Sequence, residues 1–266
     1  MLGAALVRRL RTRRSIILCY HGVGTRSARI DPGFLRVTPT ALRAQLRLLE
    51  DAGFEFVTVA EFAERADGRE PPPGLIALSF DDGMDDNHSI LLPILRELGL
   101  PATVYVATGL MGKPNPWLAE DSGARMMNTY ELRDLSAAGV EIGAHTVTHP
   151  DLSLLGFEAC LREARESKRA LEELLGAPVR TFAYPFCRYS PAAVAAVREA
   201  GFDAAVTCEG RGTWDPYELR RTLVTGKDGQ TAFILKLARL HEPLWSLPPV
   251  RLLRAATRGF RERRRA

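Results

Sequence analysis

Short runs of β-type residues alternate along this chain with segments in which apolar residues recur every three to four positions. Such alternation predicts a largely parallel sheet built from βα units. The expected strands cover residues 15–21, 56–59, 75–80, 102–107, 140–145, 180–184, 204–207 and 219–225. The expected helices cover residues 40–52, 87–98, 129–138, 157–175 and 191–200. This many consecutive units predicts a closed or nearly closed α/β barrel, in which a site forms at the carboxyl ends of the strands.

The positive charge of the chain is concentrated at its two ends. Residues 1–14 contain five Arg and no acidic residue, and residues 251–266 contain seven Arg and one Glu. The remaining residues carry a net charge of about −7, so the sequence pI of about 9.0 describes the ends and not the body. A nucleic-acid-binding domain is expected to be basic, which argues against nucleic acid as a partner. We expect a basic N-terminal extension over residues 1–14, one barrel domain over 15–240 and a basic C-terminal tail over 241–266.

The charged ends of the chain and its cysteines give expectations for the cellular compartment of the protein. The Arg-rich ends are either solvated charge or a peripheral contact with an anionic membrane surface, which attracts Arg side chains. Residues 1–14 run from apolar to basic, the reverse of a secretory signal, and no apolar run is long enough for a membrane-spanning helix. We therefore expect a cytoplasmic protein, or one bound at the membrane periphery. The cysteines contain no CxxC pair and suit a reducing compartment, although a disulfide among them stays open: Cys19, Cys160, Cys187 and Cys208.

Two polar segments follow two of the expected strands. Ser79-Phe80-Asp81-Asp82-Gly83 ends the apolar run 75–80, and His145-Thr146-Val147-Thr148-His149 follows the run 140–145. Asp82, His145 and His149 would supply three ligands to a divalent ion of the zinc type and leave a position for water. Successive side chains on an extended chain diverge, so Asp81 is expected to be the base that takes a proton from water. The residues between the two histidines predict a turn and not a helix.

These segments resemble the motifs of the polysaccharide deacetylase family, metal-dependent carbohydrate esterases that include chitin, peptidoglycan and poly-N-acetylglucosamine deacetylases. Residues 79–83 are similar to the family's Thr/Ser-Phe-Asp-Asp-Gly motif, and residues 145–149 to its His-Ser/Thr-x-x-His motif. The resemblance covers about residues 15–225 and implies a distorted (β/α)7 barrel as the single catalytic domain. It also implies that Asp81 is the base and that Asp82, His145 and His149 bind the metal. We expect this metal to be Zn, with Co or Ni as alternatives.

One segment departs from the family's pattern. Many members have Arg-Pro-Pro-Tyr-Gly where this chain has Ala183-Tyr184-Pro185-Phe186-Cys187. The Arg that steadies the base is therefore missing, and Arg221 is the candidate to replace it; the alternative is a surface or salt-bridged Arg221. The backbone N–H of Phe186 is expected to stabilise the oxyanion, because this role needs no particular side chain. Cys187 replaces the usual Gly, which predicts an altered turn.

The family's late Leu-x-His motif, whose His often acts as the general acid, is also missing. His241 is the only later histidine and lies beyond the expected barrel. The first strand ends in Cys19-Tyr20-His21-Gly22, which resembles the first strand of poly-N-acetylglucosamine deacetylases. Imidazole titrates in the range needed to protonate a leaving amine, so His21 is the candidate acid; the alternative is a supporting role beside the site. His88 is expected to begin a helix.

The resemblance and these residues predict a hydrolase that removes an N-acetyl group from an amino sugar of a glycan or glycan precursor. Because no secretory signal is recognisable, we expect a lipid-linked or nucleotide-linked sugar as the substrate. Trp117 and Tyr184 either stack on a sugar ring or belong to the core. Three alternatives use the same barrel: O-acetyl ester hydrolysis, hydrolysis of a non-sugar amide, and glycan binding without catalysis.

Overall fold

The computed structural model describes residues 2–25, 27–208 and 214–239. Its main sheet is parallel and contains all the expected strands, with boundaries that agree with the expected ranges to within two residues. The strands are β1 (Ile16–Tyr20), β4 (Glu55–Val57), β5 (Leu75–Phe80), β6 (Thr103–Val106), β7 (Glu141–Ala144), β8 (Thr181–Ala183), β9 (Ala204–Thr207) and β10 (Leu219–Leu223). Most of them are buried along their whole length, which explains their continuous apolar runs.

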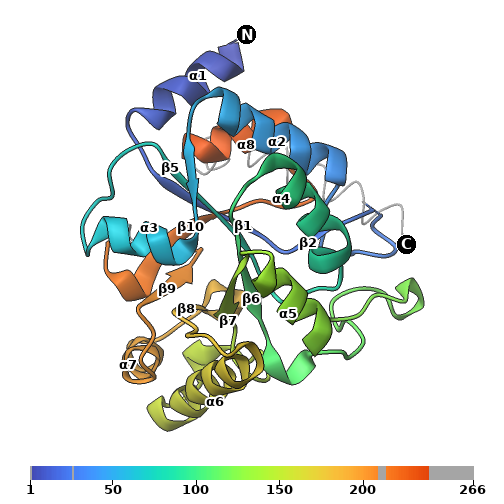
Figure 1. Cartoon of the computed structure of the whole chain (residues 1–266), viewed down its shortest axis with the longest axis vertical. Helices are drawn as coiled ribbons and strands as arrows, with labels where there is room; N and C mark the ends of the chain where they lie inside the picture. The colour runs from blue at the N-terminus through green and yellow to red at the C-terminus, as the bar shows by residue number, and fades with distance from the viewer. Residues whose placement is uncertain (1, 26, 209–213, 240–266) are drawn as a thin grey trace, which may run out of the picture.

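Seven of these strands close into a barrel. The neighbour order is β1-β10-β9-β8-β7-β6-β5, and β5 pairs again with β1. One edge of β5 serves two neighbours: its first residues pair with β4, and Ser79 and Phe80 pair with β6. β4 therefore lies beside the ring, which consists of seven strands. Figure 1 shows the strands of the barrel at the centre and the helices around them. The predicted (β/α)7 barrel is confirmed.

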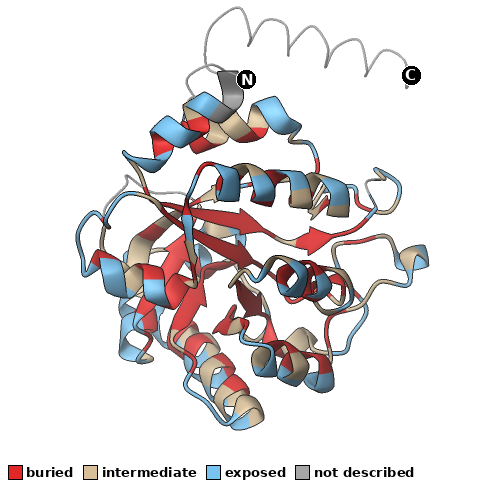
Figure 2. Cartoon of the chain, turned by 45° about the horizontal axis from the view of Figure 1, so that its top comes forward, coloured by how far each residue is buried: buried red, intermediate tan, exposed pale blue. Residues whose placement is uncertain are grey.

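Helices surround the barrel, and each expected helix is present. They are α2 (Pro39–Asp51), the π-helical turn η1 (Asn87–Leu91) continued by α4 (Leu92–Leu98), α5 (Thr129–Ala137), α6 (Phe157–Leu175) and α7 (Pro191–Glu199). Side-chain caps explain two of the starts. Thr38 accepts a hydrogen bond from the Ala41 N–H at 3.2 Å, and Ser190 accepts one from the Ala193 N–H at 3.2 Å. Figure 2 shows the resulting pattern, with buried strands inside and exposed helix faces outside.

The sequence did not predict three helices and a small second sheet. The helices are α1 (Leu2–Arg11), α3 (Val59–Ala66) and α8 (Gln230–Leu237), and the second sheet pairs β2 (Gly22–Val23) with β3 (Arg36–Val37). α3 begins where the expected strand 56–59 should have continued. Thr58 accepts a hydrogen bond from the Glu61 N–H and donates its own N–H to the Glu61 carboxylate, so a capping box starts the helix.

Residues 2–14, the expected basic extension, pack onto the barrel. Val7 and Leu10 of α1 are buried, and α1 contacts α2 and α8. The Arg14 carbonyl accepts a hydrogen bond from the Gly74 N–H at 2.9 Å, immediately before β5. α1 therefore lies at the amino ends of the strands, opposite the expected site. The expected tail 241–266 and His241 lie outside the described residues. In the described part of the chain, every helix is too short or too polar to cross a membrane.

The amino-terminal half of the barrel interior is packed with side chains. A separate buried cluster there includes Ile17, Ala77, Tyr105 and Leu219 from four of the strands. The Tyr105 ring takes the space beside Gly143, where an added Cβ would lie 2.3 Å from a ring carbon. Because inward positions recur every second residue along a strand, the next inward positions toward the carboxyl ends are polar. The site is therefore built on a packed floor.

Candidate active site

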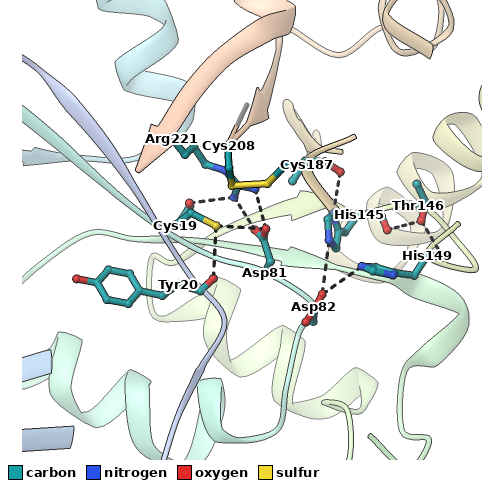
Figure 3. Close-up of polar contacts among 12 residues, drawn as sticks. Cys19, Tyr20, Asp81, Asp82, His145, Thr146, His149, Cys187, Cys208 and Arg221 are labelled. Carbon is teal, nitrogen blue, oxygen red and sulfur yellow. Dashed lines mark hydrogen bonds and ion pairs between the residues drawn. A yellow bond between two sulfur atoms is a disulfide. The ribbon is translucent and has the colours of Figure 1, made fainter. Parts of the chain in front are cut away.

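The adjacent carboxylates Asp81 and Asp82 follow β5 and point to different partners. Asp81 continues the strand, whereas Asp82 has φ 76° and Gly83 has φ 80°, so the chain turns sharply after Asp81. A left-handed backbone is uncommon outside glycine but is tolerated best by Asp and Asn. The turn separates the two side chains. One carboxylate contacts an arginine and the other contacts two histidines (Figure 3).

The three predicted metal ligands come together at the barrel mouth. Asp82 Oδ1 lies 3.5 Å from His145 Nε2 and 3.3 Å from His149 Nε2, and the three ligand atoms are all within 4.8 Å of one another. Ligand atoms held tetrahedrally at about 2.0–2.2 Å from one ion are about 3.3–3.6 Å apart. The carboxylate–imidazole spacings therefore fit an ion of the zinc type, and the donor set of one carboxylate and two imidazoles suits it.

The segment between the histidines is a turn, as predicted. Thr146 has φ 68° and His149 has φ 59°, and the Thr146 hydroxyl accepts a hydrogen bond from the His149 N–H at 3.0 Å. Glu163 of α6 holds the rest of the turn, because its carboxylate accepts the N–H groups of Val147 at 2.7 Å and Thr148 at 2.9 Å. A glutamate on the outer helix thus shapes the loop that carries both imidazoles.

Hydrogen bonds and burial affect the protonation and orientation of Asp82, His145 and His149, and thereby their ability to bind a cation. His145 Nδ1–H donates to the Ala183 carbonyl at 2.7 Å, which leaves the Nε2 lone pair for a metal. Burial raises the pKa of Asp82, but in the metal-free protein the neighbouring imidazoles of His145 and His149 outweigh it and hold the pKa below its usual range. Burial lowers the pKa of both imidazoles: it prevails at His149 and favours the neutral form, whereas at His145 the contact with Asp82 outweighs it and the pKa is raised. An ionised carboxylate and neutral imidazoles are the forms that bind metal.

Asp81 forms a bidentate ion pair with Arg221 inside the barrel. Arg221 Nη1 lies 2.6 Å from Asp81 Oδ1, and Nη2 lies 2.7 Å from Oδ2. Nη1 also donates to Ser79 Oγ at 3.1 Å, and the Cys19 thiol donates to Asp81 Oδ2 at 3.5 Å. The Arg221 side chain has 0% exposure. Burial raises the pKa of Asp81, but the Arg221 cation outweighs it, so this carboxyl group has a lowered pKa.

His21 directly follows β1 at the same rim. Its carbonyl accepts a hydrogen bond from Asn87 Nδ2 at 2.9 Å. Burial has the largest effect on the pKa of both Asp81 and Asp82, and the charge of His21 is among the influences that lower both values. The ring therefore lies within electrostatic reach of both carboxylates. His88 belongs to η1, as predicted, and contacts Asp134 at 2.8 Å on the outer helices.

Two aromatic rings contact the imidazole of His149. The Trp117 ring centroid lies 4.8 Å from the His149 ring, and the Phe186 centroid lies 4.7 Å from it. The Phe186 side chain is 53% exposed. Tyr184 is fully buried and donates its hydroxyl to the Tyr217 carbonyl at 3.0 Å, so Tyr184 is a core residue. Trp117 is the aromatic candidate that remains beside the site.

Two of the cysteines form a disulfide, Cys187–Cys208, with 5.2 Å between the Cα atoms. Cys19 and Cys160 are free and buried. The disulfide that the sequence left open is therefore present between the first pair. Structural disulfides persist mainly in oxidising compartments, so the cysteines no longer support a cytoplasmic location. Both bonded residues come shortly after neighbouring strands, β8 and β9, and this common position is the signal that could have paired them.

Sequence reasoning did not assign Cys19 and Glu163 to the site. Cys19 precedes His21 by two residues on β1, so the alternation of a strand could have placed both on the inner face. Glu163 has no comparable signal, because it acts from the second turn of α6 across a loop that only the fold defines.

Comparisons with known proteins agree with this geometry. The family model described as polysaccharide deacetylase matches residues 68–205. YxkH of Bacillus subtilis is 24% identical over 221 residues, which cover 82% of this chain and 74% of that protein. A poly-beta-1,6-N-acetyl-D-glucosamine N-deacetylase of Staphylococcus aureus is 22% identical over 182 residues, 65% of this chain and 61% of that protein. The Streptococcus pyogenes deacetylase PplD, solved in complex with acetate, has a TM-score of 0.70 at 24% identity over 84% of this chain and 98% of that chain.

Proposed function

The chain belongs to the polysaccharide deacetylase family, and we propose that it hydrolyses the N-acetyl group of an amino sugar in a glycan or glycan precursor. The observation that carries this proposal is that two adjacent carboxylates have different partners. Asp82 faces two imidazoles at metal-ligand spacing, while Asp81 is held by Arg221 as an ionised base. Hydrolysis of an amide by activated water needs both groups in one site.

Asp82, His145 and His149 are the residues that would hold a divalent ion, which we propose to be Zn, with Co or Ni as substitutes. When bound, such an ion polarises a carbonyl group and lowers the pKa of water toward about 7. The chain itself contributes the orientation of the ligands. The Ala183 carbonyl and the Glu163 carboxylate fix the imidazole of His145 and the turn that carries His149.

The other residues act on the proton and on the developing charge. Asp81 takes a proton from the water that attacks the acetyl carbon, and Arg221 keeps the Asp81 carboxylate oriented for this transfer. The Phe186 N–H donates to the oxyanion of the tetrahedral intermediate. His21 then gives a proton to the nitrogen as the C–N bond breaks, and acetate and the free amine are released.

Acetate release tests this proposal. We would incubate the protein, reloaded with Zn²⁺, Co²⁺ or Ni²⁺, with N-acetylglucosamine oligomers and with nucleotide-linked and lipid-linked N-acetyl sugars. Asp81→Asn should abolish metal-dependent release, whereas Asp51→Asn at the exposed end of α2 should not. The proposal fails if metal is bound and no N-acetyl sugar releases acetate.

The same assay separates the alternatives. Faster release from O-acetyl sugars would favour an esterase, and release only from a non-sugar amide would favour an amidase. A barrel that only binds glycans would retain glycan affinity in Asp81→Asn and release no acetate in the wild type. We also propose that exposed arginines of residues 2–14, Arg8, Arg9 and Arg13 among them, could meet an anionic membrane. Because they lie at the amino end of the barrel, such contact would leave the site facing solvent.

A further inference from the structure

The turn after β8 has a backbone that ordinary residues avoid. Phe186 and Cys187 both have φ 57°, so two consecutive residues with side chains adopt the left-handed conformation. Such residues persist only where their surroundings hold them. Inside the turn, the Cys187 N–H donates to the Tyr184 carbonyl and the Arg188 N–H to the Pro185 carbonyl, each at 3.0 Å. These two local bonds would break together if the turn opened.

Contacts from outside the turn converge on Cys187. The Thr207 hydroxyl donates to the Cys187 carbonyl at 3.1 Å, and the disulfide joins Cys187 to Cys208 (Figure 3). Cys208 directly follows β9, and Ala183 of β8 pairs in register with Val206 of β9. The barrel wall therefore fixes Cys208, and the disulfide anchors the left-handed turn to that wall.

We propose that the Cys187–Cys208 disulfide is a positioning element that holds the Phe186 N–H toward the oxyanion. This inference rests on the role proposed above for that N–H. The family's usual Gly at position 187 would adopt the left-handed conformation without a side-chain penalty. In this chain Cys187 lacks that freedom, and the cross-link to Cys208 holds it in the left-handed conformation instead. The enzyme should therefore be most active when the disulfide is intact.

Reduction should release the turn. A dithiol reductant transfers two electrons and two protons to the disulfide, which yields the thiols of Cys187 and Cys208 and a cyclic disulfide of the reductant. Both cysteines are half-buried at the barrel mouth, so a small reductant can reach them. Free of the cross-link, Cys187 can return to the ordinary backbone region, and this rotates the peptide groups that flank Phe186.

Two variants of the metal-loaded full-length protein test the inference without a reductant that could bind metal. Cys208→Ala removes the cross-link and lets Cys187 leave its unfavourable left-handed conformation, so kcat should fall at least tenfold while KM stays within about twofold. Cys187→Gly with Cys208→Ala removes the cross-link and the penalty together, so kcat should recover to within about threefold of the wild type. Cys160→Ala, which alters a buried thiol on α6, is the matched control.

A disulfide that serves only general stability would give another pattern. Both variants would then melt at lower temperature and both would keep the wild-type kcat, which would overturn the inference; so would a double variant as slow as Cys208→Ala. Failure of the proposed function is recognised separately, because the wild type would then release no acetate. Amide hydrogen exchange in residues 184–188 needs no substrate. It should accelerate in Cys208→Ala, and unchanged exchange there would also refute the inference.

Discussion

Arg221 of β10 donates a hydrogen bond to each carboxylate oxygen of Asp81, although 140 residues separate the two along the chain. Ser79 Oγ accepts a further hydrogen bond from Arg221, and the Cys19 thiol donates one to Asp81, so both members of the buried ion pair have an additional partner. In this barrel the guanidinium reaches Asp81 from β10, and not from the segment after β8 where the family pattern places an Arg.

Arg221→Met should lower the free energy of unfolding by about 3–5 kcal/mol, because it leaves an uncompensated buried carboxylate. Arg221→Lys should cost less stability, since it keeps the charge, but should still lower kcat because a lysine cannot contact both oxygens at once. Urea unfolding and acetate release measure the two effects. Arg169→Met, at an exposed i,i+4 pair of α6, should change stability by less than about 0.5 kcal/mol. Equal stability of Arg221→Met and the wild type would contradict this account.

His21→Ala should slow hydrolysis of an N-acetyl sugar by about 10²–10⁴-fold, the usual contribution of a general acid. An aryl acetate has a leaving group that departs without a proton, so its hydrolysis should fall far less. The ratio of the two rates in the variant and the wild type is the measurement. If both substrates slow equally, His21 supports the site in another way and is not the acid.

Glu163→Gln should weaken metal binding by about 10–100-fold, as is usual when a group that orients the ligands is changed. The neutral amide is a weaker acceptor for the Val147 and Thr148 N–H groups, so the turn that carries His149 loosens. Competition with a chromogenic chelator gives the affinity. Glu166→Gln, exposed on the same helix, is the control and should bind metal like the wild type.

The metal-free protein should lose stability in acid. Asp81 and Asp82 have folded pKa values below the usual range, in spite of burial, because Arg221 and the two histidines respectively outweigh it. A carboxyl group of this kind stabilises the fold above its unfolded pKa of about 3.9 and loses that contribution as the pH falls through its lower folded value. Thermal unfolding in EDTA between pH 7 and pH 2 should show this decline. Asp82→Asn should show a shallower decline, and an identical slope would refute the assignment.

The strands and the metal ligands could be predicted from the sequence because their signals are local. A strand buried on both faces is a continuous apolar run, and parallel strands end at one rim, so Asp82, His145 and His149 could be expected to meet. α3 was missed because Val57-Thr58-Val59 continues a β-type pattern, and only the capping box of Thr58 and Glu61 ends it. The contact of Arg221 with Asp81 and the pairing of Cys187 with Cys208 depend on which strands become neighbours. That information is in the closure of the barrel and not in any segment.

The Tyr105 ring, packed against Gly143, fills the barrel interior, so the site opens only toward the carboxyl ends of the described strands. The Tyr105 ring lies 5.6 Å from the Arg221 guanidinium carbon and is fully buried, so the floor beneath Asp81 is closed in the described part of the chain. Water, substrate and both products then share one opening. Under the function proposed above, an acetyl group that reaches Asp81 would enter ahead of its sugar, and the sugar amine would leave before acetate.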